Sequence, residues 1–265
     1  MGATDLTPAA AATGSDAGDP TRRQVLALRA AIVVALLVAW EAVSASGLLF
    51  RDVVPSLRSI AAALMRVLAA PEFYGHLGAS ASEVAAGLAV GGALGLLAGV
   101  VIGANRFAAD AYEALIHYLG PTPKIVFFPV MIMWFGVGAG SKVAMAAISC
   151  FFPIAISAAA GMRAIDGVLI RVGRSFGARP WQMATKIYLP AMRAPVRNGL
   201  RLGLGVAIIG TLLAETKLSN RGVGHLVIQA YSTFDMPRMY ALLIVVFVAA
   251  IGLNALIGRG ERRPR

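Results

Sequence analysis

The chain has 265 residues, of which 58% are hydrophobic and 14% are charged, and its mean hydropathy is +0.75. This composition is too apolar for a water-soluble domain of this length, so the sequence indicates an all-α integral membrane protein. The net charge of +11 raises the question of nucleic-acid binding, which depends on where in the chain the basic residues lie.

Residues 1–20 are small, polar or alanine-rich, contain three Asp and no Lys or Arg, and are predicted to form a disordered N-terminal tail. Six apolar segments follow, each close to the ~20 residues that a helix needs to cross a bilayer. They are residues 26–49, 83–104, 113–136, 143–162, 199–216 and 239–258. This pattern predicts one compact bundle of six transmembrane helices.

The first segment has two interpretations. Arg22 and Arg23 precede the apolar run, and "VSA" at 43–45 resembles the cleavage site of a signal peptide. A retained first transmembrane helix over 26–49 is favoured, because the apolar run extends to Phe50 and more spans follow.

The second segment carries glycines at a strict spacing of four. They are Gly87, Gly91, Gly95, Gly99 and Gly103. Small residues repeating at this interval lie on one face of a helix and allow another helix to approach closely in lipid. We therefore predict that this segment packs at the centre of the bundle, and Gly199 and Gly203 form a shorter version of the motif in the fifth segment.

The third segment contains Gly120, Pro121, Pro123 and Pro129, which are expected to break its helix. Membrane proteins tolerate such a break where the freed carbonyl groups face protein or a water-filled cavity, so this segment is predicted to line a pathway. Lys124 lies at the break, and two roles remain open: facing the pathway, or acting as a paired structural cation. Glu41 and Glu215 are interpreted as structural, because each lies near an expected membrane interface.

The basic residues are distributed by topology. With both termini cytoplasmic, 16 Lys and Arg residues lie on the inner side and seven on the outer side, where Lys142 is assigned to a loop. The positive-inside rule thus predicts cytoplasmic termini. It also accounts for the net charge, and without an aromatic-interleaved basic patch we expect no nucleic-acid binding.

Catalytic and metal-binding patterns are absent from the sequence. The glycine-rich "GVGAGSK" at 136–142 lacks the spacing of a phosphate-binding loop, and no nucleophilic triad, paired carboxylates or HExxH helix occurs. Cys150 is the single cysteine, and His76, His117 and His225 show no ligand spacing, so no metal and no cofactor are expected. The spans hold few acids for ion coupling, so active transport would need energy from a partner.

A basic segment between the fourth and fifth spans is predicted to form two short amphipathic helices. Asp166 can cap the first, Gly177 can end it in the left-handed conformation, Pro180 can begin the second and Pro190 can close the unit. The apolar positions are Ile165, Leu169, Val172 and Phe176, then Trp181, Ala184, Ile187 and Tyr188. Such a stripe can lie on lipid, with the arginines at anionic headgroups, or fill a groove on a cytosolic partner.

This segment, "GARPWQMATKIYLP" at its end, resembles the EAA loop of binding-protein-dependent ABC importer permeases. The pattern of that loop is EAA, three residues, Gly, nine residues, then I-x-L-P. The residues that keep this spacing are Gly177, Ile187, Leu189 and Pro190. Arg171, Val172 and Gly173 occupy the positions of the EAA triplet, so the acidic start of the family's pattern is missing here.

The resemblance extends over most of the chain. "AWE" in the first span, "PTPKIVFFPVMIMWFGVGAGSK" around the third, "FFPIAISAAAGM" in the fourth and "LLAETKLSNRGVGHLV" after the fifth are similar to the nitrate, sulfonate and taurine branch of these permeases. The resemblance implies an extracytoplasmic segment over 50–82, a permease core over 83–260 with a coupling loop at 164–190, and a basic tail over 261–265.

The resemblance also implies partners and roles. A non-catalytic permease of this kind sits in the cell inner membrane, pairs with a second copy as a homodimer, and works with a cytosolic ABC ATPase dimer and an extracytoplasmic solute-binding protein. The implied ATPase-coupling residues are Arg171, Phe176, Gly177, Ala178, Trp181, Ile187, Leu189 and Pro190. The expected solute is a small oxyanion, sulfonate or related organic compound, which Lys124 would suit. The alternatives are a stand-alone channel or facilitator whose loop binds lipid, and, with no polar cluster to support it, an enzyme acting on lipid.

Overall fold

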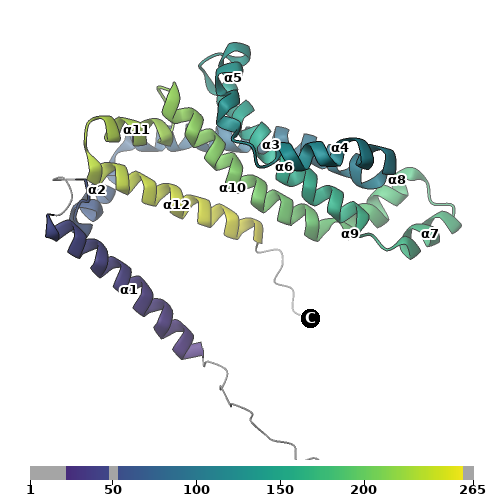
Figure 1. Ribbon diagram of the computed structural model, residues 1–265, viewed down its shortest axis with the longest axis horizontal. Coiled ribbons are helices and arrows are strands. Elements are labelled where there is room, and N and C mark those ends of the chain that lie inside the picture. The colour runs from purple at the N-terminus through teal and green to yellow at the C-terminus, as the bar shows by residue number, and fades with distance from the viewer. Residues whose placement is uncertain (1–21, 48–52, 259–265) are drawn as a thin grey trace, which may run out of the picture. The chain divides into compact units, whose positions relative to one another are not determined.

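The computed structural model describes residues 22–47 and 53–258, and the regular structure in these two ranges is helical (Figure 1). The predicted tails at 1–20 and 261–265 lie outside the described residues. Contacts divide the chain into two compact units, residues 1–57 and 58–265.

The first unit contains α1 (Arg22–Ser46), a helix whose apolar side chains are exposed around its whole circumference. A helix that is apolar on every side fits a lipid environment. The chain after α1 folds back onto it, since Trp40 Nε1 donates a hydrogen bond to the Pro55 carbonyl (3.0 Å) and Glu41 Oε2 accepts one from Leu57 N (2.9 Å). Within this unit, Glu41 therefore serves a structural contact.

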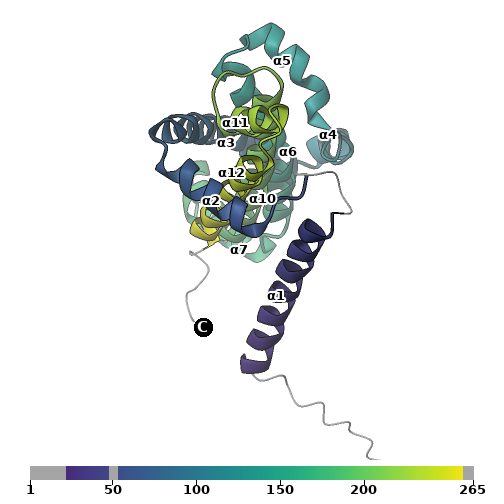
Figure 2. The ribbon, with the colours of Figure 1, turned by 90° about the vertical axis from the view of Figure 1, so that its left-hand side faces the viewer.

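Three long helices form the centre of the second unit (Figures 1 and 2). They are α3 (Pro71–Ala104), α6 (Ala139–Arg163) and α10 (Arg193–Lys217). The glycine row of α3 faces α6: a Cβ atom on any of these five glycines would come within 3.0 Å of an α6 atom. The α6 carbonyl groups that they face also recur every four residues, at Val143, Ala147, Phe151, Ala155 and Ala159.

This register fixes the relative directions of the long helices. Gly87 lies against Val143 and Gly103 lies against Ala159, so α3 and α6 run parallel. Helix α10 runs antiparallel to α6, because Gly199 lies beside Ser157 while Gly210 lies beside Ser149. Parallel α3 and α6 require the chain between them to return across the bundle.

That return is made by a broken pair of helices. Helix α4 (Arg106–Leu119) is followed by a short 3-10 turn, η1 (Lys124–Phe127), and by α5 (Phe128–Phe135). The pair bends by 94°, and α5 projects from the axis of the long helices (Figure 2). The break falls at residues 120–123, whereas Pro129 lies in the first turn of α5, where its missing N–H costs no helical hydrogen bond.

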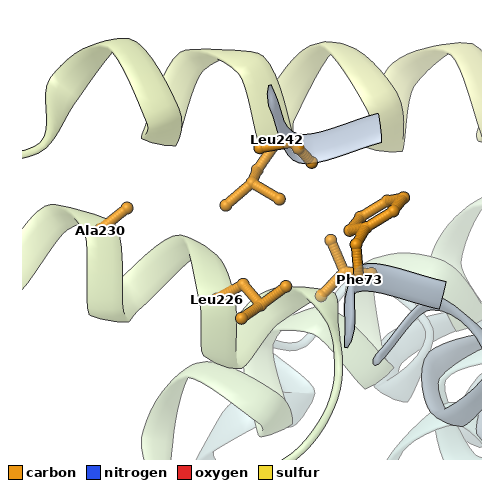
Figure 3. Packing of buried hydrophobic residues seen from close by; sticks show 6 residues of the cluster. Phe73, Leu226, Ala230 and Leu242 are labelled. Carbon is orange, nitrogen blue, oxygen red and sulfur yellow. The ribbon is translucent and has the colours of Figure 1, made fainter. Parts of the chain in front are cut away.

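Two short helices and the start of the last long helix gather at one end of the bundle. They are α2 (Leu57–Ala69), α11 (Val223–Ser232) and α12 (Met236–Gly258). Figure 3 shows Phe73 of α3, Leu226 and Ala230 of α11 and Leu242 of α12 converging in one buried cluster. Helix α12 then runs antiparallel beside α10, where Arg201 Nε donates to Asn254 Oδ1 (3.1 Å).

The described residues contain five helices that are long and apolar enough to cross a membrane, and a sixth span if α4 and α5 count as one. The boundaries of the predicted spans differ most at the second, since α3 begins at Pro71 rather than at residue 83. Its first turns are too polar to register as a span, yet nothing in them interrupts a helix. At 34 residues α3 is about 51 Å long, well beyond the ~30 Å of hydrocarbon.

Substituting Gly95 with Ala tests the packing of α3 against α6. The added Cβ would lie 2.6 Å from the Phe151 carbonyl oxygen, which belongs to the backbone and cannot rotate away. Overpacking of this kind costs about 1–3 kcal/mol, so we expect a lower thermal midpoint for the detergent-solubilised protein. Gly252→Ala in α12 is the control, because no atom lies within 4 Å of that position, and an equal loss in both variants would contradict the assignment.

Candidate functional site

The segment between α6 and α10 forms the pair of short helices that the sequence predicts. Helix α7 (Gly167–Ser175) is capped by Asp166, whose Oδ1 accepts a hydrogen bond from Val168 N (2.8 Å). Gly177 follows with φ +66°, the left-handed conformation that favours glycine. Its N–H donates to the Arg174 carbonyl (2.9 Å) and Ala178 N donates to the Gly173 carbonyl (3.0 Å), so two of the last carbonyl groups of α7 have partners beyond the helix.

The second short helix begins at Pro180, also as predicted, but Pro190 does not end it. Helix α8 (Pro180–Met183) leads into a π-helical stretch, Ala184–Tyr188, and then into α9 (Leu189–Ala191), which contains Pro190. The prediction that Pro190 closes the unit is therefore wrong. Pro190 lies in the first turn of α9, where its missing N–H is tolerated, and Met192 joins this turn to α10.

The two short helices meet at Gly173. A Cβ atom there would lie 2.5 Å from Ile187 Cδ1 and 2.7 Å from Met183 Sδ, so α7 and the following turn approach each other closely. Sequence reasoning placed Gly173 in the third position of the EAA triplet without assigning it a role. The small residue that the family's pattern has at this position is the signal that could have indicated the contact.

Residues 164–190 are the segment predicted to be the coupling loop, and this name is kept for them below. Their apolar side chains divide into an outward and an inward set. Phe176 is 87% exposed, Trp181 is 76% exposed and Leu189 is 58% exposed. Ile187 instead packs, with Ile165, in a cluster where α6 ends and α10 begins. Ile187 thus holds the loop to the bundle, while the two aromatic side chains point away from it.

A cavity of about 520 Å³ lies at the break between α4 and η1. Its walls come from the break itself, from α6 and from α10, and include Pro121, Pro123 and Lys124 but not Pro129. Lys124 Nζ donates hydrogen bonds to the carbonyl groups of Gly120 and Thr122, and it lies 5.0 Å from the centroid of the Phe152 ring. No carboxylate pairs with Lys124 in the described part of the chain, so its charge is held by carbonyl dipoles and an aromatic face.

A buried polar network occupies the opposite end of the bundle from the coupling loop. Lys142 Nζ lies 3.5 Å from Glu83 Oε1, and both residues are buried. The assignment of Lys142 to an outer loop is therefore wrong: it belongs to α6 and faces α3. Glu215 is fully buried and accepts hydrogen bonds from Ser80 Oγ and Gly224 N, both at 2.6 Å.

Of the three histidines and the cysteine, only His117 lines the cavity at Lys124. His76, His225 and Cys150 lie outside both this cavity and the coupling loop. His76 and His225, distant in sequence, stack with their ring centroids 6.1 Å apart. Cys150 is buried where α6 meets α3. Across the ranges described, no group of three or more His, Cys, Asp or Glu residues is placed to hold a metal ion.

The chain matches the family model described as binding-protein-dependent transport system inner membrane component over residues 91–265. It is 27% identical to the protein named aliphatic sulfonates transport permease protein SsuC of Bacillus subtilis, over 92% of this chain and 89% of that protein. It is 28% identical to the taurine transport system permease protein TauC of Escherichia coli, over 89% of each chain. It is 27% identical to the formylaminopyrimidine transport permease protein ThiX of Halalkalibacterium halodurans, over 83% of this chain and 88% of that protein.

A match over more than half of the residues, together with relatives that align along nearly the whole length, establishes the class. The chain belongs to the permease family of binding-protein-dependent ABC importers, in its sulfonate and taurine branch. It is accordingly a multi-pass protein of the inner membrane, and the family works with an ATPase and a solute-binding protein.

Replacing Gly177 tests how the coupling loop keeps its shape. No atom lies within 4 Å of a Cβ added there, so Gly177→Ala introduces only the backbone penalty of the left-handed conformation, roughly 1–2 kcal/mol. We expect amide hydrogen exchange at the C-terminal end of α7 to become about 5- to 30-fold faster in the intact protein. Gly177→Asn, which tolerates this conformation better, is expected to show a smaller change, and equal rates in all three proteins would contradict the prediction.

Proposed function

We propose that this chain is the membrane-spanning, non-catalytic subunit of an ATP-driven importer, and that the coupling loop is the element that binds the cytosolic ATPase dimer. The observation that carries this proposal is the exposure of Phe176 and Trp181 on a helix pair whose own interior is packed. Large exposed aromatic side chains that can be buried in a partner's pocket are typical anchors of protein interfaces. A loop adapted only to lipid would not require the close contact of α7 with Met183 and Ile187.

The orientation of the chain in the membrane follows from the loop. The coupling loop joins the C-terminal end of α6 to the start of α10, and the end of α12 returns to the same side of the bundle beside Arg201. With the ATPase in the cytosol, this side is cytoplasmic and so is the carboxyl terminus. The excess of Lys and Arg on this side favours the same orientation and places the amino terminus in the cytosol as well.

The transport mechanism uses the direct connection between the coupling loop and the cavity wall. Met162 and Ile165 at the end of α6 pack against Met192 at the start of α10 and against Ile187 of the loop. Movement of the loop by the closing ATPases therefore displaces α6 and α10, which form two walls of the cavity. In a homodimer, two coupling loops drawn together would tilt both bundles from an inward-open to an outward-open arrangement.

The proposed solute is a small oxyanion or sulfonate, delivered by an extracytoplasmic binding protein. Two of the relatives are named for sulfonates and taurine, which carry a sulfonate group. The cavity suits such a solute because Lys124 lies in its wall without a carboxylate partner among the described residues. A relative named for formylaminopyrimidine shows that the family also includes transporters of other organic compounds.

Removing the exposed aromatic side chains tests the coupling role. Trp181→Ala and Phe176→Ala are expected to abolish co-purification of the ATPase subunit, because each loses a side chain that a partner would bury. At the strongest interface positions such a loss weakens the binding free energy by roughly 2 kcal/mol or more. Trp134→Ala is the matched control, since Trp134 is 72% exposed on α5, away from the loop. Unchanged ATPase binding in the loop variants would instead support a stand-alone channel whose loop contacts lipid.

Neutralising Lys124 tests the substrate class. In proteoliposomes containing the complete assembly, Lys124→Met is expected to lower uptake of a sulfonate at limiting concentration by about tenfold, because a charge-assisted contact of roughly 1.5 kcal/mol is lost. Lys124→Arg keeps the positive charge and is expected to retain most of the uptake. ATPase binding is measured in parallel and should be unchanged; full uptake by Lys124→Met would rule out a role in anion passage.

A further inference from the structure

A cluster of charged side chains lies buried at the end of the bundle opposite the coupling loop. Glu83 of α3 is 5% exposed, Lys142 of α6 is 3% exposed and Glu215 of α10 is 0% exposed. Lys142 pairs with Glu83 Oε1, and Glu215 accepts a hydrogen bond from Ser80, which lies one helical turn before Glu83 on α3, so the two acids occupy neighbouring turns of one cluster. Three helices thus bring two acids and one base into a space closed to solvent.

The start of α11 forms the remaining wall of this cluster. Three successive backbone N–H groups point at side chains of other helices: Gly222 N donates to His76 Nδ1 (3.2 Å), Val223 N to Ser80 Oγ (2.8 Å) and Gly224 N to Glu215 Oε2. These are donors that a helix leaves unsatisfied at its N-terminus. Glycine is required at 222, where φ is +103° and a Cβ would overlap the Glu215 carboxyl group.

The charges of the cluster do not balance if both acids are ionised. Two carboxylates face one ammonium group, and a buried charge without compensation costs several kcal/mol. The N-terminus of α11 offers the equivalent of only about half a positive charge. The His76 Nδ1 atom accepts the hydrogen bond from Gly222 N, and in that role it does not donate to the carboxyl groups.

The hydrogen bonds of the two carboxyl groups show where a proton fits. Both oxygens of Glu215 accept hydrogen bonds, from Ser80 and Gly224. Glu83 Oε1 faces Lys142, whereas Glu83 Oε2 is buried and has no hydrogen-bond partner in the described part of the chain. Two neighbouring buried carboxyl groups, one of which has an unsatisfied oxygen, form an arrangement in which two acids can hold one proton.

We propose that Glu83 and Glu215 bind a single proton between them, which makes the cluster with Lys142 electrically neutral. The proton supplies the missing partner for Glu83 Oε2 and removes the uncompensated charge. The cluster then joins α3, α6, α10 and the start of α11 into one block at this end of the bundle. This inference does not depend on the identity of the solute or on the role of the coupling loop.

Infrared spectroscopy of the purified full-length protein tests for this proton directly. The wild-type spectrum is expected to contain a protonated-carboxyl stretching band. This band should disappear in Glu83→Gln and also in Glu215→Gln, because the acid left in either variant ionises to pair with Lys142. Glu113→Gln is the control, since Glu113 pairs with Arg163 at a partly exposed site and should leave the band unchanged. Absence of the band in wild type, or its loss in only one of the two variants, would overturn the proposal.

Lys142→Met provides a second measurement that keeps both acids. Without the ammonium group the cluster needs a second proton to become neutral, so the band is expected to approximately double in intensity. In thermal unfolding, the double variant Glu83→Gln/Glu215→Gln should lose far more stability than the two single variants together, because Lys142 is left buried without a counter-charge. Adding Lys142→Met to the double variant should restore the midpoint, and additive losses without restoration would contradict the charge balance.

Discussion

The close contact between α3 and α6 is the constraint on which the rest of the bundle depends. In lipid there is no hydrophobic driving force to bring apolar helices together, so their association relies on dispersion and weak hydrogen bonds gained at short distance. The glycine row of α3 allows this by facing α6 carbonyl groups at the same interval of four residues. Because both rows ascend in the same direction, the contact also makes the two helices parallel.

Parallel α3 and α6 determine how the intervening chain is used. It must cross back, and it does so through a pair of helices bent by 94° at residues 120–123. The bend leaves backbone carbonyl groups without helical partners, and Lys124 takes up two of them while it lines the adjoining cavity. The break that lets the chain cross back between parallel helices therefore also exposes carbonyl groups and a lysine to the cavity, as expected of a solute pathway.

The two ends of the bundle are built differently. At the end with the coupling loop, α7 to α9 are held to α6 and α10 by apolar contacts around Ile165, Ile187 and Met192, while the aromatic side chains of Phe176 and Trp181 stay exposed. At the other end, a buried charge cluster and the N-terminus of α11 tie the long helices together. In the proposed mechanism the first end contacts the ATPase, while the second holds the long helices together.

Several features were predictable from the sequence alone: the all-helical membrane class, the packing face of the second span, the break near Lys124 and the capped ends of α7. Each depends on local periodicity, on proline and glycine chemistry, or on capping within a few residues. The family resemblance rested on similarly local motifs, and the match over residues 91–265 confirms it. Three other features are visible only in the folded chain: Lys142 is buried against Glu83, Ile187 faces the bundle, and helical structure continues through Pro190. These features depend on contacts between helices far apart in the chain, and hydropathy and spacing carry no information about which distant side chain lies opposite.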